Sequence, residues 1–222
     1  MPGPDRISRF GFVNCYLVGE EDGLTLVDTM VPGSAKRILA GAADIGRPIV
    51  RIVLTHAHGD HVGSLDALAE SLPDAEVSIT ARDARLLAGD KTLDPDEPPD
   101  KLRGSYPGAK TRPHRMLEPG ERVGSLEVVP APGHSPGQIA LLDTRDRTLL
   151  CADAFSTLGG VATSAKLNPR FPLPALATWH RPTALESARA LRALEPRRLA
   201  PGHGSIVEEP LGQMDAALAK AG

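Results

Sequence analysis

A short segment in the first third of the chain concentrates side chains that bind metal ions. The segment Thr55-His56-Ala57-His58-Gly59-Asp60-His61 places three histidines and one aspartate within six residues. His56 and His58 are two positions apart, so an extended backbone points both side chains to the same side. Asp60 and His61 follow a glycine, where the chain can turn. Packing gives no reason for such a density of polar groups, whereas imidazole and carboxylate ligands suit zinc and related divalent ions. The segment therefore predicts a metal site.

Three further candidate ligands follow predicted strands, each beside a glycine or a turn. His134 lies in Pro132-Gly133-His134-Ser135-Pro136-Gly137, Asp153 ends a strand, and His203 lies in Pro201-Gly202-His203-Gly204. Each is weak alone, because a single histidine in a turn is more often a surface residue. Open α/β sheets, however, gather their sites from several strand ends. The sequence therefore predicts seven metal ligands: His56, His58, Asp60, His61, His134, Asp153 and His203.

Hydrophobic periodicity predicts the elements that position these residues. Strands are expected over 13–18, 24–28, 49–54, 76–80, 126–130, 139–143, 148–152 and 198–200, and helices over 34–43, 64–71, 82–88, 185–194 and 210–220. The Ser34 hydroxyl is expected to cap the first helix. Asp28, at a strand end, is expected either to orient a ligand histidine or to form a turn. The irregular segments 90–113 and 157–174 are expected to flank the site as loops that set specificity.

The order of the ligands resembles the metallo-β-lactamase superfamily. The resemblance is carried by His56-x-His58-x-Asp60-His61, followed by His134, Asp153 and His203. Asn14-Cys15-Tyr16 and Leu26-Val27-Asp28-Thr29 are also similar to the family's first strands. Because the similarity covers nearly the whole chain, it implies one domain over residues 1–222. The implied fold is of the α+β class, an αββα sandwich of two mostly antiparallel sheets with helices outside.

The same resemblance implies a role for each ligand. His56, His58 and His134 would hold a first metal, Asp60, His61 and His203 a second, and Asp153 would bridge both. Two divalent ions about 3.5–4 Å apart can share one hydroxide, which attacks an electrophile such as a carbonyl carbon. The expected ions are zinc, with iron or manganese as alternatives. Asp60 is the expected catalytic residue, since it could take and pass the proton.

Two classes of enzyme fit these ligands. The first is a binuclear hydrolase of a small ester, lactone or thioester. Hydroxyacylglutathione hydrolases are similar in ligand order, but they carry a basic C-terminal region that grips glutathione, whereas this chain ends in an Ala-rich segment with the single lysine Lys220. Glutathione thioesters are therefore not expected. The second class is a mononuclear iron persulfide dioxygenase, which would use the first histidines and the bridging aspartate.

Composition argues against other kinds of partner. The net charge of -3 over 222 residues gives no basic surface for nucleic acid or anionic membrane. Residues 1–10 contain no apolar run of signal-peptide length, and no stretch approaches the roughly 18 apolar residues of a membrane span. We expect a cytoplasmic protein acting on a small molecule; the sequence does not predict its oligomeric state.

Several remaining residues are expected to lie outside the ligand set. Cys15 and Cys151 lie in predicted strands and are expected to be buried thiols rather than a disulfide. His114 and His180 lack the glycine-turn context and are expected at the surface or in a lid. The aromatic residues expected either to line an apolar pocket or to anchor their own loops are Tyr106, Phe155, Phe171 and Trp179.

Overall fold

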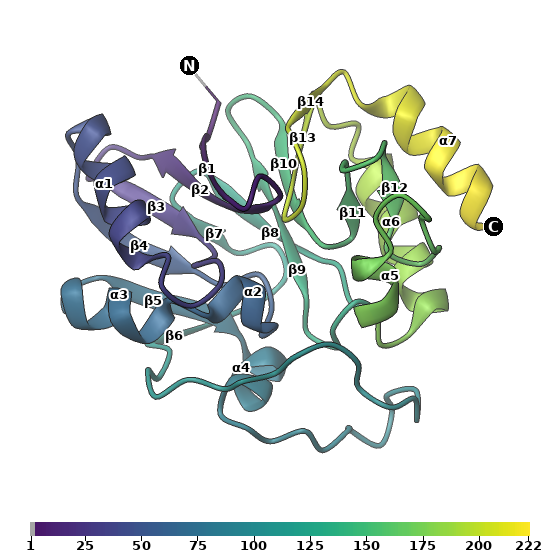
Figure 1. The fold of residues 1–222 in the computed structure, drawn as a ribbon, viewed down its shortest axis with the longest axis horizontal. Coiled ribbons are helices and arrows are strands. Elements are labelled where there is room, and N and C mark those ends of the chain that lie inside the picture. The colour runs from purple at the N-terminus through teal and green to yellow at the C-terminus, as the bar shows by residue number, and fades with distance from the viewer. Residues whose placement is uncertain (1–2) are drawn as a thin grey trace.

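Two six-stranded sheets form the centre of the protein, with helices on their outer sides (Figure 1). The computed structural model describes residues 3–222; residues 1 and 2, the start of the segment that lacks a signal-peptide pattern, lie outside the described residues. The first sheet has the order β1 (Asp5–Arg9), β2 (Val13–Gly19), β3 (Leu24–Val27), β4 (Ile49–Val53), β5 (Glu76–Thr80) and β6 (Arg115–Leu117). The second has the order β14 (Val207–Glu208), β13 (Arg198–Pro201), β10 (Thr148–Ala152), β9 (Ile139–Asp143), β8 (Leu126–Pro130) and β7 (Arg122–Val123).

Alternation along the strands produces the layers. In β2, Cys15 and Leu17 pack toward the helices of the first sheet, whereas Tyr16 and Val18 pack against the second sheet. In the helix that follows β3, Ile38 and Ala42 are buried four positions apart on one face. The helices over the first sheet are α1 (Ala35–Ile45), α2 (Gly59–Val62), α3 (Leu65–Ser71) and α4 (Ala81–Leu87), and those on the other side are α5 (Leu173–Ala177), α6 (Arg181–Ala193) and α7 (Leu211–Ala221). The α+β sandwich with outer helices is therefore confirmed.

Sheet pairing differs in part from the expected antiparallel arrangement. The second sheet has a single parallel pair, β10 with β13, and is otherwise antiparallel. In the first sheet, β3 to β6 run parallel in three successive pairs, so this sheet is mixed. Helices α1, α3 and α4 connect these strands, and a parallel pair needs such a crossover.

Local predictions differ from the structure at a few positions. Ser34 is the residue before α1, but its hydroxyl donates to the Val31 carbonyl at 2.7 Å and does not cap the helix. Segment 90–113 is irregular as expected, whereas 157–174 contains the short strand β12 (Ala162–Thr163) and the start of α5. Strand β12 pairs with β11 (Phe155–Ser156). Within residues 3–222, no helix is long and apolar enough to cross a membrane.

Candidate metal centre

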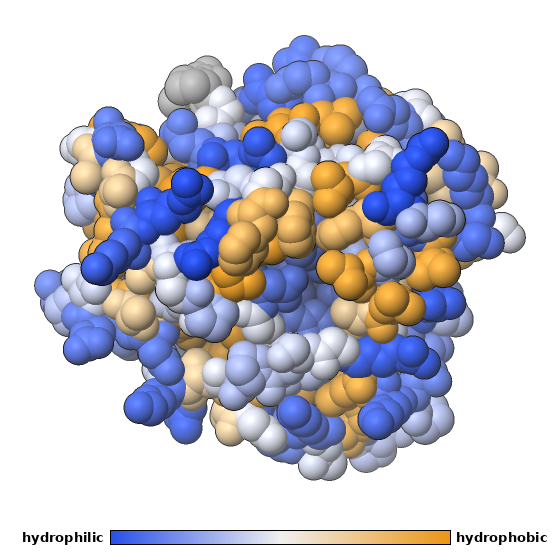
Figure 2. Space-filling model, viewed as in Figure 1, coloured by the Kyte–Doolittle hydropathy of each residue, from blue (hydrophilic) through white to orange (hydrophobic). Residues whose placement is uncertain are grey.

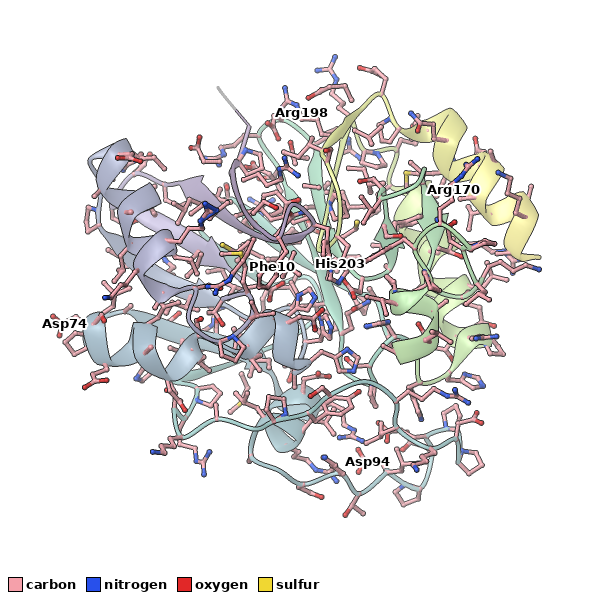
Figure 3. The ribbon with its side chains drawn as sticks, viewed as in Figure 1. Phe10, Asp74, Asp94, Arg170, Arg198 and His203 are labelled. Carbon is pink, nitrogen blue, oxygen red and sulfur yellow. The ribbon has the colours of Figure 1, made fainter. Side chains whose placement is uncertain are left out.

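The fold brings all seven predicted ligands together at one end of the two facing sheets. The segment after β4 supplies His56, His58, Asp60 and His61, and the second sheet supplies the other three after β8, β10 and β13. In Figure 3, His203 lies near the middle of the molecule, between the part that carries α1 to α3 and the part that carries α5 to α7. The strand ends of both sheets therefore face one small volume.

The ligand atoms fall into two groups that share one carboxylate. In the first group, His58 Nδ1 lies 3.2 Å from His56 Nε2 and 3.0 Å from His134 Nε2. The second group contains Asp60, His61, Asp153 and His203, and the atoms within each group lie within 4.8 Å of one another. One oxygen of Asp153, Oδ2, lies 3.3 Å from His134 Nε2 and 3.2 Å from His203 Nε2. Asp153 is thus placed to contact an ion in either group.

Contacts at the outer ring nitrogens determine which nitrogen of each histidine faces the centre. A carbonyl or carboxylate oxygen only accepts, so a ring nitrogen bonded to it carries the proton and leaves the other with a free lone pair. His61 Nδ1 donates to Asp28 Oδ2 at 2.7 Å, His58 Nε2 to the Arg103 carbonyl at 3.0 Å, and His203 Nδ1 to the Phe12 carbonyl at 3.2 Å. When neutral, these three histidines therefore direct a lone pair inward.

The other two histidines are bonded to threonine hydroxyls whose own protons are already committed. Thr55 Oγ1 donates to the Asp28 carboxylate, so it accepts from His56 Nδ1 at 3.1 Å. Thr178 Oγ1 donates to a backbone carbonyl of Ser164 or Pro174, so it accepts from His134 Nδ1 at 3.0 Å. In their neutral forms, all five histidines would therefore direct an unprotonated ring nitrogen into one buried volume, as the ligands of a cation do.

Burial and the carboxylates of Asp60 and Asp153 shift the pKa values of the histidines in opposite directions. Burial lowers the pKa of His56, His58 and His134, that of His134 to about 3. Burial also acts to lower the pKa of His203, but Asp153 outweighs it and raises that pKa to about 9. For Asp153, burial alone would raise the pKa, yet His203 and His61 hold it well below its usual value. Despite burial, Asp28 and Asp153 likewise raise the pKa of His61, so the first group offers neutral imidazoles, whereas the second pairs two histidines with ionised carboxylates.

Asp28 has the orienting role expected for it. Its carboxylate accepts from the Thr55 amide at 2.8 Å as well as from His61, so it connects β3 to the ligand segment after β4. Its backbone is left-handed, with φ of 63°, a conformation that Asp tolerates better than most residues. The strand-end turn and the hydrogen bond to a ligand are therefore both present in this residue.

A buried carboxylate that the sequence did not single out holds two ligand segments together. Asp83, in the first turn of α4, accepts from the Ala57 amide at 2.7 Å and the Gly137 amide at 2.7 Å. Its oxygens also accept from the Ser135 hydroxyl at 3.1 Å. Burial raises its pKa to about 6, although these three donors favour the ionised form. An acidic residue in a first helical turn ordinarily indicates only a favourable interaction with the helix dipole, so no local pattern singles out Asp83.

The local backbone at Asp153 is shaped by an irregularity in β10. The register with β13 shifts between Leu150 and Ala152, and Ala152 has a left-handed φ of 47°. Such a bulge redirects the following side chain. Cys151 alternates with Leu150 along the strand and packs on the outer side of the sheet, away from the proposed ligands.

Gly202, just before the ligand His203, is required by the close approach of the second metal group. A methyl group at this position would clash with Asp153 Oδ1 and lie 2.7 Å from His61 Cε1. We expect Gly202→Ala to displace these ligands by a fraction of an ångström and to lower kcat/KM about tenfold, less than a 1 Å misplacement costs. The control is Gly212→Ala on α7, where an added methyl group has open space. The metal content of both variants is measured alongside kcat/KM. Equal kcat/KM for Gly202→Ala and Gly212→Ala would contradict the expectation.

The remaining histidines and the two cysteines lie outside the ligand cluster. His114 is exposed, and His180 is half-buried and accepts from the Thr183 amide at the start of α6, so neither joins the cluster. Cys15 and Cys151 are buried free thiols, as expected.

Among the aromatic residues, Tyr106 lies 4.5 Å from the His58 ring and Phe171 5.4 Å from the His203 ring, measured between centroids. Trp179 donates to the Asp100 carbonyl at 2.8 Å and so anchors segment 90–113. Phe155 is fully buried in the core on the outer side of the second sheet, so of its two expected roles, lining a pocket is excluded. Phe12, which the sequence did not suggest, lies against Phe171 and His203 instead.

Comparison with known proteins identifies the family. The model of the metallo-beta-lactamase superfamily matches residues 8–203. The uncharacterized protein YobT of Bacillus subtilis (strain 168) is 48% identical over 210 residues, 94% of this chain and 90% of its own. YflN of the same organism, named a probable metallo-hydrolase, is 29% identical and aligns over 86% of this chain and 80% of its own. The chain therefore belongs to the metallo-β-lactamase superfamily.

Solved structures agree with this assignment. The protein TTHA1623 in a di-iron-bound form superposes with a TM-score of 0.68 and 27% identity, covering 95% of this chain and 96% of its own. The B3 metallo-beta-lactamase BLEG-1 superposes with a TM-score of 0.69, covering 92% of this chain and 94% of its own, but at 19% identity this similarity shows the fold alone.

Proposed function

We propose that this protein is a metal-dependent hydrolase that holds two divalent ions and cleaves a small ester, lactone or thioester. The observation that carries the proposal is the set of five histidines whose outer nitrogens all have hydrogen-bond partners, so that their inner nitrogens and two carboxylates converge on one buried volume. His61 Nε2 and Asp153 Oδ1 are buried there without a hydrogen-bond partner, as expected for ligand atoms. The names of related proteins as metallo-hydrolases support the same class of reaction.

The positions of the seven proposed ligands assign them to two ions. His56, His58 and His134 fit one ion, Asp60, His61 and His203 fit the other, and Asp153 is shared. When bound, such ions supply Lewis acidity toward a carbonyl oxygen and lower the pKa of a water molecule toward neutrality. We propose zinc; the di-iron form of a related protein makes iron the principal alternative.

Asp60 is placed to move the proton. Its carboxylate is 38% exposed at the opening of the pocket, whereas that of Asp153 is 4% exposed and lies in the depth. Burial would raise the pKa of Asp60, but the hydrogen bond from His203 keeps it well below the usual value, so the group is ionised and accepts a proton from the attacking water. Delivery of that proton to the leaving oxygen or sulfur would complete the hydrolysis.

Metal analysis combined with a substrate panel tests the proposal. The protein is purified without added metal, its metals per chain are determined, and it is assayed with lactones, thioesters and phosphodiesters. About two zinc ions per chain, with turnover that is lost in Asp60→Ala, would support the hydrolase. About one iron per chain, with oxygen consumed in the presence of a persulfide, would overturn it in favour of the dioxygenase.

A further inference from the structure

Large apolar side chains are exposed around the opening above the metal centre. Leu173 and Leu176 on α5 are 54% and 51% exposed, and both line the pocket of about 300 Å³ that contains the ligands. Phe10, in the turn between β1 and β2, is 69% exposed and lies two residues before Phe12, which lines the same pocket. Single exposed apolar residues are normal, but several around one cavity mark a binding surface.

The two sides of the opening are built differently. On one side, the Phe12 ring lies 5.7 Å from Phe171, and both rings lie against His203. On the other side, α5 presents its two leucines. Figure 2 shows hydrophobic surface on either side of a hollow whose depth is hydrophilic. A substrate whose reacting group enters the hollow would therefore lay its remaining part against apolar walls.

Within residues 3–222, no lysine or arginine lines this pocket to bind an anionic substrate. Apart from the proposed metal ligands, its lining has no charged member: Phe12, Gly104, Ser105, Leu173, Pro174, Leu176 and Ala177. Recognition of a carboxylate or phosphate ordinarily uses Arg or Lys. A larger cavity of about 600 Å³, between residues 159–170 and α7, is lined by Lys166, Arg170 and Lys220, but none of the seven proposed ligands lies there. The walls of the metal pocket thus favour a neutral ligand.

We propose that the substrate is a neutral ester, lactone or thioester with an apolar chain, and that Leu173, Leu176 and Phe12 determine this specificity. This inference rests on the proposed hydrolase function. For a thioester, water oxygen bonds to the acyl carbon, the carbon–sulfur bond breaks, and the thiol leaves with one proton. The acyl chain lies along α5 while the carbonyl reaches the ligands.

Matched thioesters separate the effect of chain length from that of charge. Acetyl and hexanoyl thioesters of N-acetylcysteamine, which is neutral, are compared with the same thioesters of glutathione, which is anionic, using protein with two metals per chain. Each methylene that leaves water contributes up to about fourfold in affinity, so the four added methylenes should raise kcat/KM about tenfold or more even when half-buried. The kcat/KM of the neutral N-acetylcysteamine thioesters is expected to exceed that of the glutathione thioesters by a similar factor.

A double variant and a matched control identify the residues responsible. Leu173→Ser with Leu176→Ser should lower the ratio of hexanoyl to acetyl kcat/KM at least about fivefold, and because both leucines are half-exposed and carry little of the core, the variant should still fold. Leu167→Ser is the control, since Leu167 is 45% exposed but does not line this pocket. Binding of 2-octanone and 2-butanone, which cannot be hydrolysed, is measured calorimetrically on metal-free protein as a second readout.

The outcomes distinguish the two proposals. Hydrolysis with equal rates for acetyl and hexanoyl, or with glutathione thioesters preferred, would overturn the inference while the hydrolase stands. No turnover of any ester, lactone or thioester by the two-metal protein would overturn the hydrolase and the substrate assignment together. Tighter binding of 2-octanone than of 2-butanone, lost in the double variant but kept in the control, would support the apolar walls independently of turnover.

Discussion

Replacing Asp153 with asparagine is expected to lower kcat/KM by more than about 100-fold, beyond the upper end of losses from residues that only orient a ligand. Oδ1 of Asp153 lies 3.3 Å from His61 Nε2, and Oδ2 faces His134 and His203. Asparagine keeps the shape but places an amide nitrogen, which cannot bind a cation, at one of these positions. The bound metal should therefore fall below two ions per chain, as measured by elemental analysis together with kcat/KM.

A second buried aspartate of the same sheet provides the control. Asp143 in β9 is also about 4% exposed, but it pairs with Arg145 at 2.6 Å and touches no ligand. Asp143→Asn should lose some stability and keep its metals and its kcat/KM per folded molecule. If Asp153→Asn retained two ions per chain and wild-type turnover, the shared-ligand role of Asp153 would be wrong.

The gathering of the seven proposed ligands could be predicted from the sequence because each lies in a recognisable local pattern. Four lie in one heptapeptide, and each of the others follows a predicted strand beside a glycine or a turn. Asp28 was also predictable, since it ends the strand that neighbours the ligand segment, and parallel neighbours such as β3 and β4 end at the same edge of a sheet. These are properties of short stretches of chain.

Other features depend on contacts between distant segments and left no local signal. Thr178 reaches His134 across 44 residues. Strands β7 and β14 have two residues each, too few for a period of two to be recognised. The parallel part of the first sheet was in fact indicated by the alternation of strands and helices between residues 24 and 80. The resemblance to a family, which implied mostly antiparallel sheets, described the second sheet better than the first.

Replacing Asp83 is expected to change stability and zinc affinity more than any other substitution that only the structure suggests. Asp83→Ala would leave the buried amides of Ala57 and Gly137 and the Ser135 hydroxyl without their acceptor, and each such loss costs about 1 kcal/mol or more. We expect the free energy of unfolding of the metal-free protein to fall by about 3 kcal/mol, measured by urea denaturation. Because the two amides belong to the segments that carry His58 and His134, zinc affinity should also fall about 10- to 100-fold, measured by chelator competition.

A second helix offers a matched comparison for this prediction. Asp66, in the first turn of α3, likewise accepts from two backbone amides of a loop, those of Lys110 and Thr111, but it is exposed and touches no ligand segment. Asp66→Ala should cost less stability and leave zinc affinity unchanged, since water can replace its contacts. If Asp83→Ala lost stability but bound zinc as tightly as the wild type, Asp83 would support the fold without positioning the ligands. A joint loss of both would show that one carboxylate, 26 residues from Ala57 and 54 from Gly137, holds two ligand segments in register for the metals.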